Sequence, residues 1–212
     1  MNINKLVPFL SKSRITCDPE DLRSGVREVY SATSRLPGGK HPFPVGRKFA
    51  EDIGYPSDLL DTIPAIAWEA FVGVSNVAVF ADIPQGATVL DIGCGAGLDS
   101  IIAARRVGAG GKVTGVDFSE DMLKRARQAV KKIAIDAQVE FYCAAAEELP
   151  MKDGSIDIIL VNGIFNLNPK RDQVFSELSR VVKAGGKVYA AEMVFTEPVK
   201  TKQVCRLDDW FS

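Results

Sequence analysis

The stretch that decides the fold is Val-Leu-Asp-Ile-Gly-Cys-Gly-Ala-Gly-Leu-Asp-Ser, residues Val89–Ser100. Its apolar start predicts a buried strand, and the helical spacing of apolar residues after its end predicts a helix. Between them stand Gly93, Gly95 and Gly97, which allow a tight turn and let a ligand approach the backbone without an intervening Cβ. The helix would also point free N–H groups and a partial positive charge at the turn. The stretch therefore predicts a strand, a glycine turn and a helix that together bind a small molecule.

The spacing of the glycines does not fit a dinucleotide-binding loop, whose fingerprint is G-x-G-x-x-G. The third glycine of that pattern would fall at Leu98 or at Ser100, depending on the register. Asp91 stands just before the turn, where a carboxylate would repel a pyrophosphate but would suit a ligand with a cationic end. S-adenosylmethionine (SAM) has such an end, an ammonium near a sulfonium. An NAD-dependent reductase is therefore disfavoured.

A second acidic residue follows at a suitable distance. Lys112–Val116 predicts a second strand, which leads to Asp117, 20 residues after Gly97. In nucleotide-binding α/β folds, an acid about 20 residues after the glycines accepts hydrogen bonds from the ribose hydroxyls. We therefore predict that Asp117 binds the ribose, with capping of the next helix as the alternative. That helix begins at Ser119, and we expect Met122 in its first turn either to touch the adenine or to fill the core.

Strands and helices alternate from Thr88 onward. Further strands are predicted at Val139–Cys143, Ile156–Val161 and Lys187–Met193, and a helix at Arg171–Lys183 that Ala184–Gly186 should stop. The alternation is typical of an α/β fold with a doubly wound, mostly parallel sheet. We expect residues 84–212 to form this SAM-binding domain. Residues 1–83, with predicted helices from Asp18, from Tyr55 and over Ile63–Phe80, should form a helical lid that holds the substrate region.

The composition limits the compartment and the partners. A net charge of −1 over 212 residues gives no basic field, so nucleic acid is not an expected partner. The apolar run Leu6–Leu10 is too short for a signal peptide, and no stretch is long enough to span a membrane. The four cysteines show no metal-binding spacing, so we expect a cytoplasmic protein without a metal. The ending, with Trp210 and Phe211, suggests a truncated chain or a partner, such as a second copy, that covers this end.

Several segments together resemble the class I SAM-dependent methyltransferases, and in particular the small-molecule group of arsenite and quinone-type enzymes. The matching segments are Asp91–Gly97, Val116–Ser119, Ala146–Pro150, Asn162–Leu167 and Arg180–Gly186. The resemblance implies a Rossmann-like methyltransferase fold in which two C-terminal strands are missing here. It also implies contacts to SAM. The implied set comprises the methionine neighbours Gly93, Cys94, Gly95 and Gly97, the ribose ligand Asp117 with Phe118, the adenine neighbours Ala146 and Glu147, and Asn162 beneath the transferring methyl.

The predicted function is methyl transfer from SAM to a small-molecule acceptor, and the alternative is a SAM- or nucleotide-binding module without turnover. Weak candidates for a general base are His41, Tyr30 and Glu192. Related enzymes often carry an Asp for the adenine where this chain has Ala145. Arsenite methyltransferases bind arsenic through cysteine thiolates, and their cysteines match Val74 and Gly163 here, so we expect no arsenite binding at that site.

Overall fold

Five strands form one parallel sheet, whose order is β3-β2-β1-β4-β5. The structure is a computed structural model and describes residues 19–194. The strands are β1 (Thr88–Ile92), β2 (Lys112–Asp117), β3 (Gln138–Cys143), β4 (Ile156–Asn162) and β5 (Val182–Ala191). The chain starts the sheet in the middle and extends it outward in both directions. The carboxyl ends of β1, β2 and β4 therefore lie together at one edge, where ligands bind in open α/β sheets.

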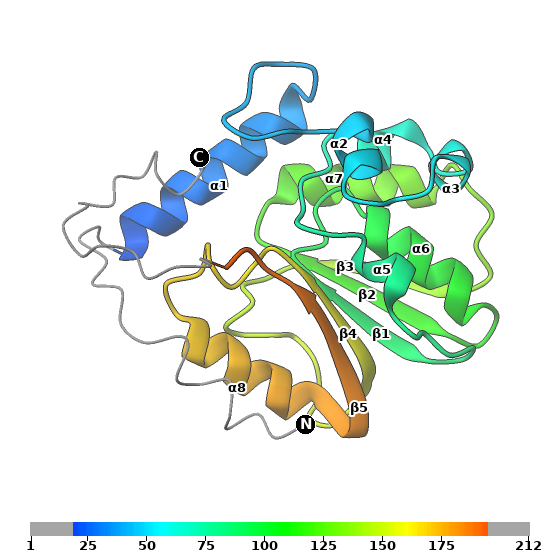
Figure 1. Cartoon of the computed structure of the whole chain (residues 1–212). Coiled ribbons are helices and arrows are strands. Elements are labelled where there is room, and N and C mark those ends of the chain that lie inside the picture. The colour runs from blue at the N-terminus through cyan, green and yellow to red at the C-terminus, as the bar shows by residue number, and fades with distance from the viewer. Residues whose placement is uncertain (1–18, 195–212) are drawn as a thin grey trace.

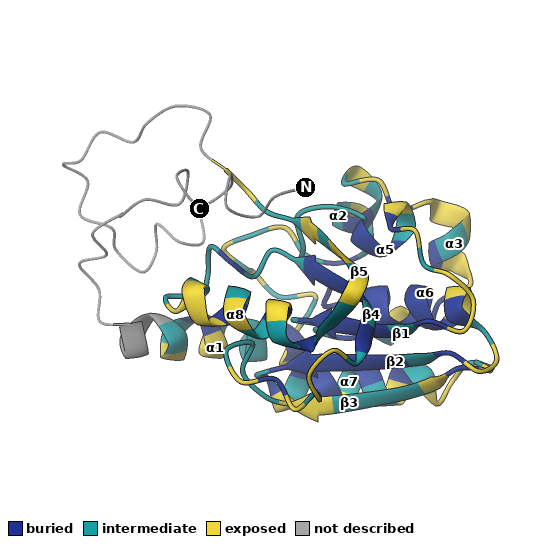
Figure 2. Cartoon of the chain, turned by 90° about the horizontal axis from the view of Figure 1, so that it is seen from below, coloured by how far each residue is buried: buried dark blue, intermediate teal, exposed yellow. Residues whose placement is uncertain are grey.

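Helices cover both faces of the sheet (Figure 1). Helices α6 (Leu98–Val107) and α7 (Glu120–Val130) lie on one face, and α8 (Arg171–Val181) lies on the other. Alternate side chains of β1 serve the two layers, since Val89 packs in the cluster with α6 and Leu90 in the cluster with α8. The central strands are consequently buried on both sides (Figure 2). These features confirm the predicted α/β fold with a doubly wound parallel sheet.

Five helices precede the sheet in the described chain. They are α1 (Pro19–Arg35), α2 (Arg47–Asp52), α3 (Ser57–Asp61), α4 (Ala65–Trp68) and α5 (Val77–Phe80). Helix α1 is fastened to the start of α7, because Arg35 pairs with Asp121 at 3.0 Å and the hydroxyls of Ser31 and Ser119 lie 3.1 Å apart. Helix α1 lies at the carboxyl edge of the sheet, whereas α5 packs against α6 and against strands β4 and β5. The boundary at residue 83 and the lid role stay predictions.

The single helix predicted over Ile63–Phe80 is wrong. The structure has two one-turn helices there, α4 and α5, with a non-helical segment between them. In that segment the N–H groups of Val74 and Ser75 donate to the side chain of Asn162, at 2.7 and 3.2 Å. Because these N–H groups donate to a side chain at the end of β4, they are not available to continue a helix.

The predicted end of α8 and the start of the fifth strand are also wrong. The helix ends at Val181 rather than at Lys183, and β5 begins at once with Val182, whose φ of −73° and ψ of 135° are extended. Two adjacent β-branched valines favour this change from helix to strand. The glycines expected to stop the helix instead lie within β5, where Gly185 has a φ of 81° beside a register irregularity. The strand ends at Ala191 rather than at Met193.

Several expectations concern residues outside the described part. These are Leu6–Leu10, Cys17, Cys205 and the terminal pair Trp210 and Phe211. Within residues 19–194, no helix has the length and apolar character needed to cross a membrane.

Candidate functional site

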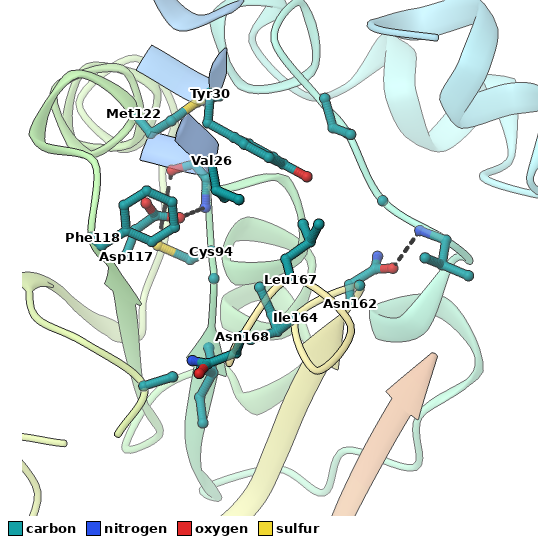
Figure 3. Close-up of a pocket in the computed structure, with 18 of the residues that line it drawn as sticks. Val26, Tyr30, Cys94, Asp117, Phe118, Met122, Asn162, Ile164, Leu167 and Asn168 are labelled. Atoms are coloured by element: carbon teal, nitrogen blue, oxygen red, sulfur yellow. Dashed lines mark hydrogen bonds between the residues drawn. The ribbon is translucent and has the colours of Figure 1, made fainter. Parts of the chain in front are cut away.

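A cavity of about 410 Å³ opens at the carboxyl edge of the sheet, under α1 and the segment that follows α4 (Figure 3). The tips of three strands reach it with Asp91 from β1, Asp117 from β2 and Asn162 from β4. The structure brings ten of the eleven predicted SAM-contacting residues to this one cavity. Those ten are Asp91, Gly93, Cys94, Gly95, Asp117, Phe118, Met122, Ala146, Glu147 and Asn162. The exception is Gly97, which lies at the N-terminus of α6 and does not line the cavity.

The Asp117 carboxylate organises the turn between β1 and α6. Its Oδ2 accepts a hydrogen bond from Gly95 N at 2.9 Å, and its Oδ1 accepts one from Ser119 N at 2.8 Å. The backbone N–H of Phe118 also bonds to this carboxylate, which can accept about four hydrogen bonds, so at least one position stays open for a ligand. Burial raises the pKa of Asp117 to about 6, against the backbone hydrogen bonds that lower it. At neutral pH the group is therefore ionised and able to accept bonds from ligand hydroxyls.

The glycine turn needs glycine for conformation and for space. Gly93 has a φ of 71°, and a Cβ there would lie 2.0 Å from Ile164 Cδ1. Gly97 has a φ of 88°, and a Cβ there would lie 3.0 Å from Ala126 Cβ on α7. The backbone of this turn is thus in close contact with the loop after β4 and with α7, and these contacts fix the floor of the cavity.

Asp91 is a buried carboxylate, only 2% exposed, at the tip of β1. Its Oδ2 accepts a hydrogen bond from Ser100 Oγ at 2.5 Å. Burial, followed by the nearby charge of Asp99, raises the pKa of Asp91 to about 8. The carboxylate has no ion-pair partner among residues 19–194. A cationic group placed beside Asp91 would therefore relieve an electrostatic penalty that the unliganded protein carries.

The adenine end that the resemblance implies lies between α1 and the loop after β3. Glu147 pairs there with Arg23 of α1, at 3.7 Å. The ring of Phe118 lies edge-on to Tyr30, with centroids 6.5 Å apart. Met122 is buried and packs beside Tyr30, as Figure 3 shows. These contacts connect α1 to the predicted cofactor side of the cavity.

The three candidate bases differ in their positions. Tyr30 points into the cavity (Figure 3), but burial and the charges of Asp117 and Glu192 raise the pKa of its phenol, which favours the protonated donor form. Glu192 also lines the cavity, with Oε2 accepting bonds from Phe165 N at 2.6 Å and Asn166 N at 3.2 Å.

His41 does not line the cavity, and the structure therefore does not place it with Tyr30 and Glu192. Its Nε2 lies 2.9 Å from the carbonyl oxygen of Leu36, and its Nδ1 lies 3.3 Å from Thr33 Oγ1. The imidazole thus holds together the loop that follows α1.

Asp99 and Tyr55 were not predicted as site residues from the sequence. The carboxylate of Asp99 is 5% exposed, and its Oδ1 accepts a hydrogen bond from Tyr55 OH at 2.6 Å. Asn162 Nδ2 donates to the other oxygen of Asp99 at 3.1 Å. A charged residue next to the apolar residues Leu98 and Ile101 in the first turn of α6 was a usable signal for Asp99. No pattern in the sequence around Tyr55 indicates that its hydroxyl bonds to Asp99.

Within residues 19–194, no three His, Cys, Asp or Glu side chains are grouped so that they could hold a metal ion.

Residues 83–210 match the family model described as a methyltransferase domain. Arsenite methyltransferase of Halobacterium salinarum is 35% identical over 196 residues, covering 85% of this chain and 49% of that protein. Demethylmenaquinone methyltransferase of Bacillus mycoides is 41% identical over 112 residues, covering 52% of this chain and 46% of that protein. The chain thus spans about half the length of the curated relatives it matches.

Among solved structures, an arsenic(III) S-adenosylmethionine methyltransferase from Chlamydomonas reinhardtii is similar, with a TM-score of 0.52 and 27% identity. The match covers 68% of this chain and 48% of that one. The family model covers more than half of the chain, and the order of the strands agrees with the methyltransferase fold. The chain therefore belongs to the class I SAM-dependent methyltransferases and is related to arsenite and menaquinone methyltransferases.

Proposed function

We propose that this protein transfers the methyl group of SAM to a small, largely apolar acceptor molecule. The observation that carries the proposal is the pair of buried carboxylates, Asp91 and Asp117, at neighbouring strand tips of one cavity. The Asp117 carboxylate would accept hydrogen bonds from the ribose hydroxyls, and Asp91 would face the cationic methionine end of SAM. The two groups would then hold opposite ends of one extended ligand.

SAM supplies an electrophilic methyl group, whose carbon accepts the acceptor's lone pair while the C–S electron pair stays on sulfur. The protein's part in such a displacement is to align the two reactants and to exclude water. The glycine turn and Asp117 would fix the donor, and α1 would cover it, since Tyr30 and Phe118 pack on that side. An acceptor that must lose a proton would face Glu192, whose pKa is raised chiefly by burial.

The remaining wall favours an apolar acceptor. Its side chains come from α1, the loop before α2, α2 itself, the segment after α4 and the loop after β4. They include Val26, Phe43, Phe49, Val74, Ile164 and Leu167. Contact with this wall would remove apolar acceptor surface from water, which stabilises a complex by about 25 cal/mol for each Å² buried.

Arsenite is not expected to bind in the cavity. Val74 and Gly163 stand where arsenite methyltransferases have cysteines, and a Cβ at Gly163 would lie 3.0 Å from Val74 Cγ2, so the two positions face each other. Neither supplies a thiolate, which the soft metalloid requires. Cys94 does line the cavity, but burial raises the pKa of its thiol well above the usual value.

Titration calorimetry with arsenite should accordingly detect no binding. The measurement should be repeated on a Cys17→Ser/Cys205→Ser variant, because those cysteines lie outside the described residues. Binding with a low micromolar dissociation constant that survives in this variant would contradict the assignment.

A second candidate function is a SAM-binding module without turnover, which the Ala145 position favours because related enzymes often carry an adenine-binding Asp there. Calorimetry with SAM and with S-adenosylhomocysteine tests binding, and incubation of methyl-labelled SAM with a small-molecule extract tests transfer. We expect binding of both compounds and a labelled product that requires the protein. Binding without any labelled product would favour the module, and no binding of either compound would contradict both functions.

A further inference from the structure

One wall of the cavity is a short irregular segment between α4 and α5. We call residues 72–75 the strap; Val72, Gly73 and Val74 of the strap line the cavity. Asn162 at the tip of β4 holds the strap in place. Its Oδ1 accepts bonds from Val74 N at 2.7 Å and Ser75 N at 3.2 Å, and its Nδ2 donates to Ser75 O at 2.7 Å (Figure 3 shows one of these bonds).

Two buried side chains in turn hold Asn162. Asp99 Oδ2 accepts from Asn162 Nδ2 at 3.1 Å, and Asp99 Oδ1 accepts from Tyr55 OH at 2.6 Å and from Ala78 N at 3.4 Å. Tyr55 OH also lies 3.3 Å from Ser75 O. The network therefore joins α6, β4, the loop before α3 and the strap through side chains that are 2% (Tyr55) and 5% (Asp99) exposed.

Packing alone does not account for this network. Burying a carboxylate is costly unless it is hydrogen-bonded, and an apolar residue of similar volume is often as stabilising or more so. Asp99 nevertheless lies among the apolar residues of α6. The fit around Asn162 is also tight, because a Cβ at Gly73 would lie 2.9 Å from Asn162 Nδ2 and 2.8 Å from Phe71 Cζ. The arrangement fixes one orientation of the Asn162 amide, with oxygen toward the strap N–H groups.

We propose that Asp99 and Tyr55 are positioning residues, which fix the Asn162 amide and through it hold the strap as a preformed wall of the cavity. That this wall faces the methyl acceptor rests on the function proposed above. The positioning itself does not, because it is a property of the unliganded protein.

Hydrogen exchange measured by mass spectrometry on the unliganded full chain tests the proposal, with peptides that contain the Val74 and Ser75 amides. Asp99→Leu keeps the branched shape and the number of side-chain heavy atoms but removes all three hydrogen bonds that Asp99 accepts, so we expect strap exchange to become about tenfold faster or more. Asp99→Asn keeps the shape of the side chain. Its oxygen can accept from Asn162 Nδ2 while its amide donates to the Tyr55 hydroxyl oxygen, which can donate to Ser75 O, so this variant should retain part of the protection. Because Asp99→Leu leaves buried donors without their acceptor, its thermal midpoint should fall by a few degrees, and exchange in β1 and β4 should change less than exchange in the strap.

Tyr55→Phe removes only the hydroxyl and keeps the ring, which packs edge-on to Phe71 at 5.1 Å. It should speed strap exchange severalfold, whereas the control Tyr142→Phe, whose hydroxyl bonds to Glu140 at the surface, should leave the strap unchanged. Strap protection that survives in both Asp99→Leu and Tyr55→Phe would overturn the proposal, as would an equal loss of protection across the sheet. If Asp99→Leu does not fold, Tyr55→Phe decides alone. Absence of methyl transfer would leave these results unaffected.

Discussion

Replacing Asp117 with alanine is expected to weaken SAM binding roughly 10- to 100-fold, since hydrogen bonds to a charged group contribute about 1.5–3 kcal/mol. The carboxylate still has acceptor capacity toward the cavity after its bonds to the backbone N–H groups of Gly95, Ser119 and Phe118. The variant loses the ribose bonds and also the anchor that shapes the glycine turn. The dissociation constant of S-adenosylhomocysteine, measured by titration calorimetry, should rise by the same factor because both compounds carry the ribose.

Asp136→Ala is a control for this measurement. Asp136 is exposed in the loop before β3 and does not line the cavity. It should bind SAM within about twofold of the parent, which is under 0.5 kcal/mol. An Asp117→Ala variant that folds and binds as tightly as the control would mean that the ribose lies elsewhere.

The affinity for SAM is expected to rise with pH, by up to tenfold for each unit between about pH 6.5 and 7.5. In the unliganded protein the pKa of Asp91 is raised to about 8, so the carboxyl is mostly protonated in this range. A cationic ligand end favours the ionised form and expels the proton. Calorimetry in buffers of different ionisation enthalpy should accordingly show the release of up to one proton for each SAM bound.

The stability of the unliganded protein should change in the opposite direction. The pKa of Asp91 is higher in the folded chain than the ordinary value of 3.8, so the folded state holds the extra proton between about pH 4 and 8. This contribution to the free energy of unfolding is lost as the pH rises through the folded pKa. Asp91→Asn does not titrate, and it should flatten both the stability curve and the affinity curve. A pH-dependent affinity that persists unchanged in Asp91→Asn would contradict the role given to Asp91.

The sheet and its functional edge are predictable from sequence because parallel strands buried on both faces leave a strong signal. The run at β1 must be apolar to serve both layers, as Val89 and Leu90 do, and polar residues are tolerated chiefly at its end. Asp91 and Asp117 therefore stand out, and the order of the strands brings their tips together. The glycine turn is equally visible because a positive φ at Gly93 restricts the residue type.

The region before β1 is less predictable because its conformation depends on tertiary contacts. The apolar pattern over Ile63–Phe80 fits one helix. In the structure, however, two backbone N–H groups of this segment donate to the side chain of Asn162, about 87 residues further along the chain, instead of to a helical carbonyl. Tyr55 and Asp99 meet across 44 residues of sequence, and no local pattern records that contact. His41, the only histidine of the sequence, was predicted as a candidate general base, yet it lies in the loop after α1 and does not line the cavity.

The most direct test is a crystal structure of the full chain with S-adenosylhomocysteine. We expect one extended ligand in the cavity, with both ribose hydroxyls within about 3 Å of the Asp117 carboxylate. Its amino group should lie on the Asp91 side of the glycine turn. A nucleoside bound with its ribose away from Asp117, or bound outside this cavity, would contradict the account.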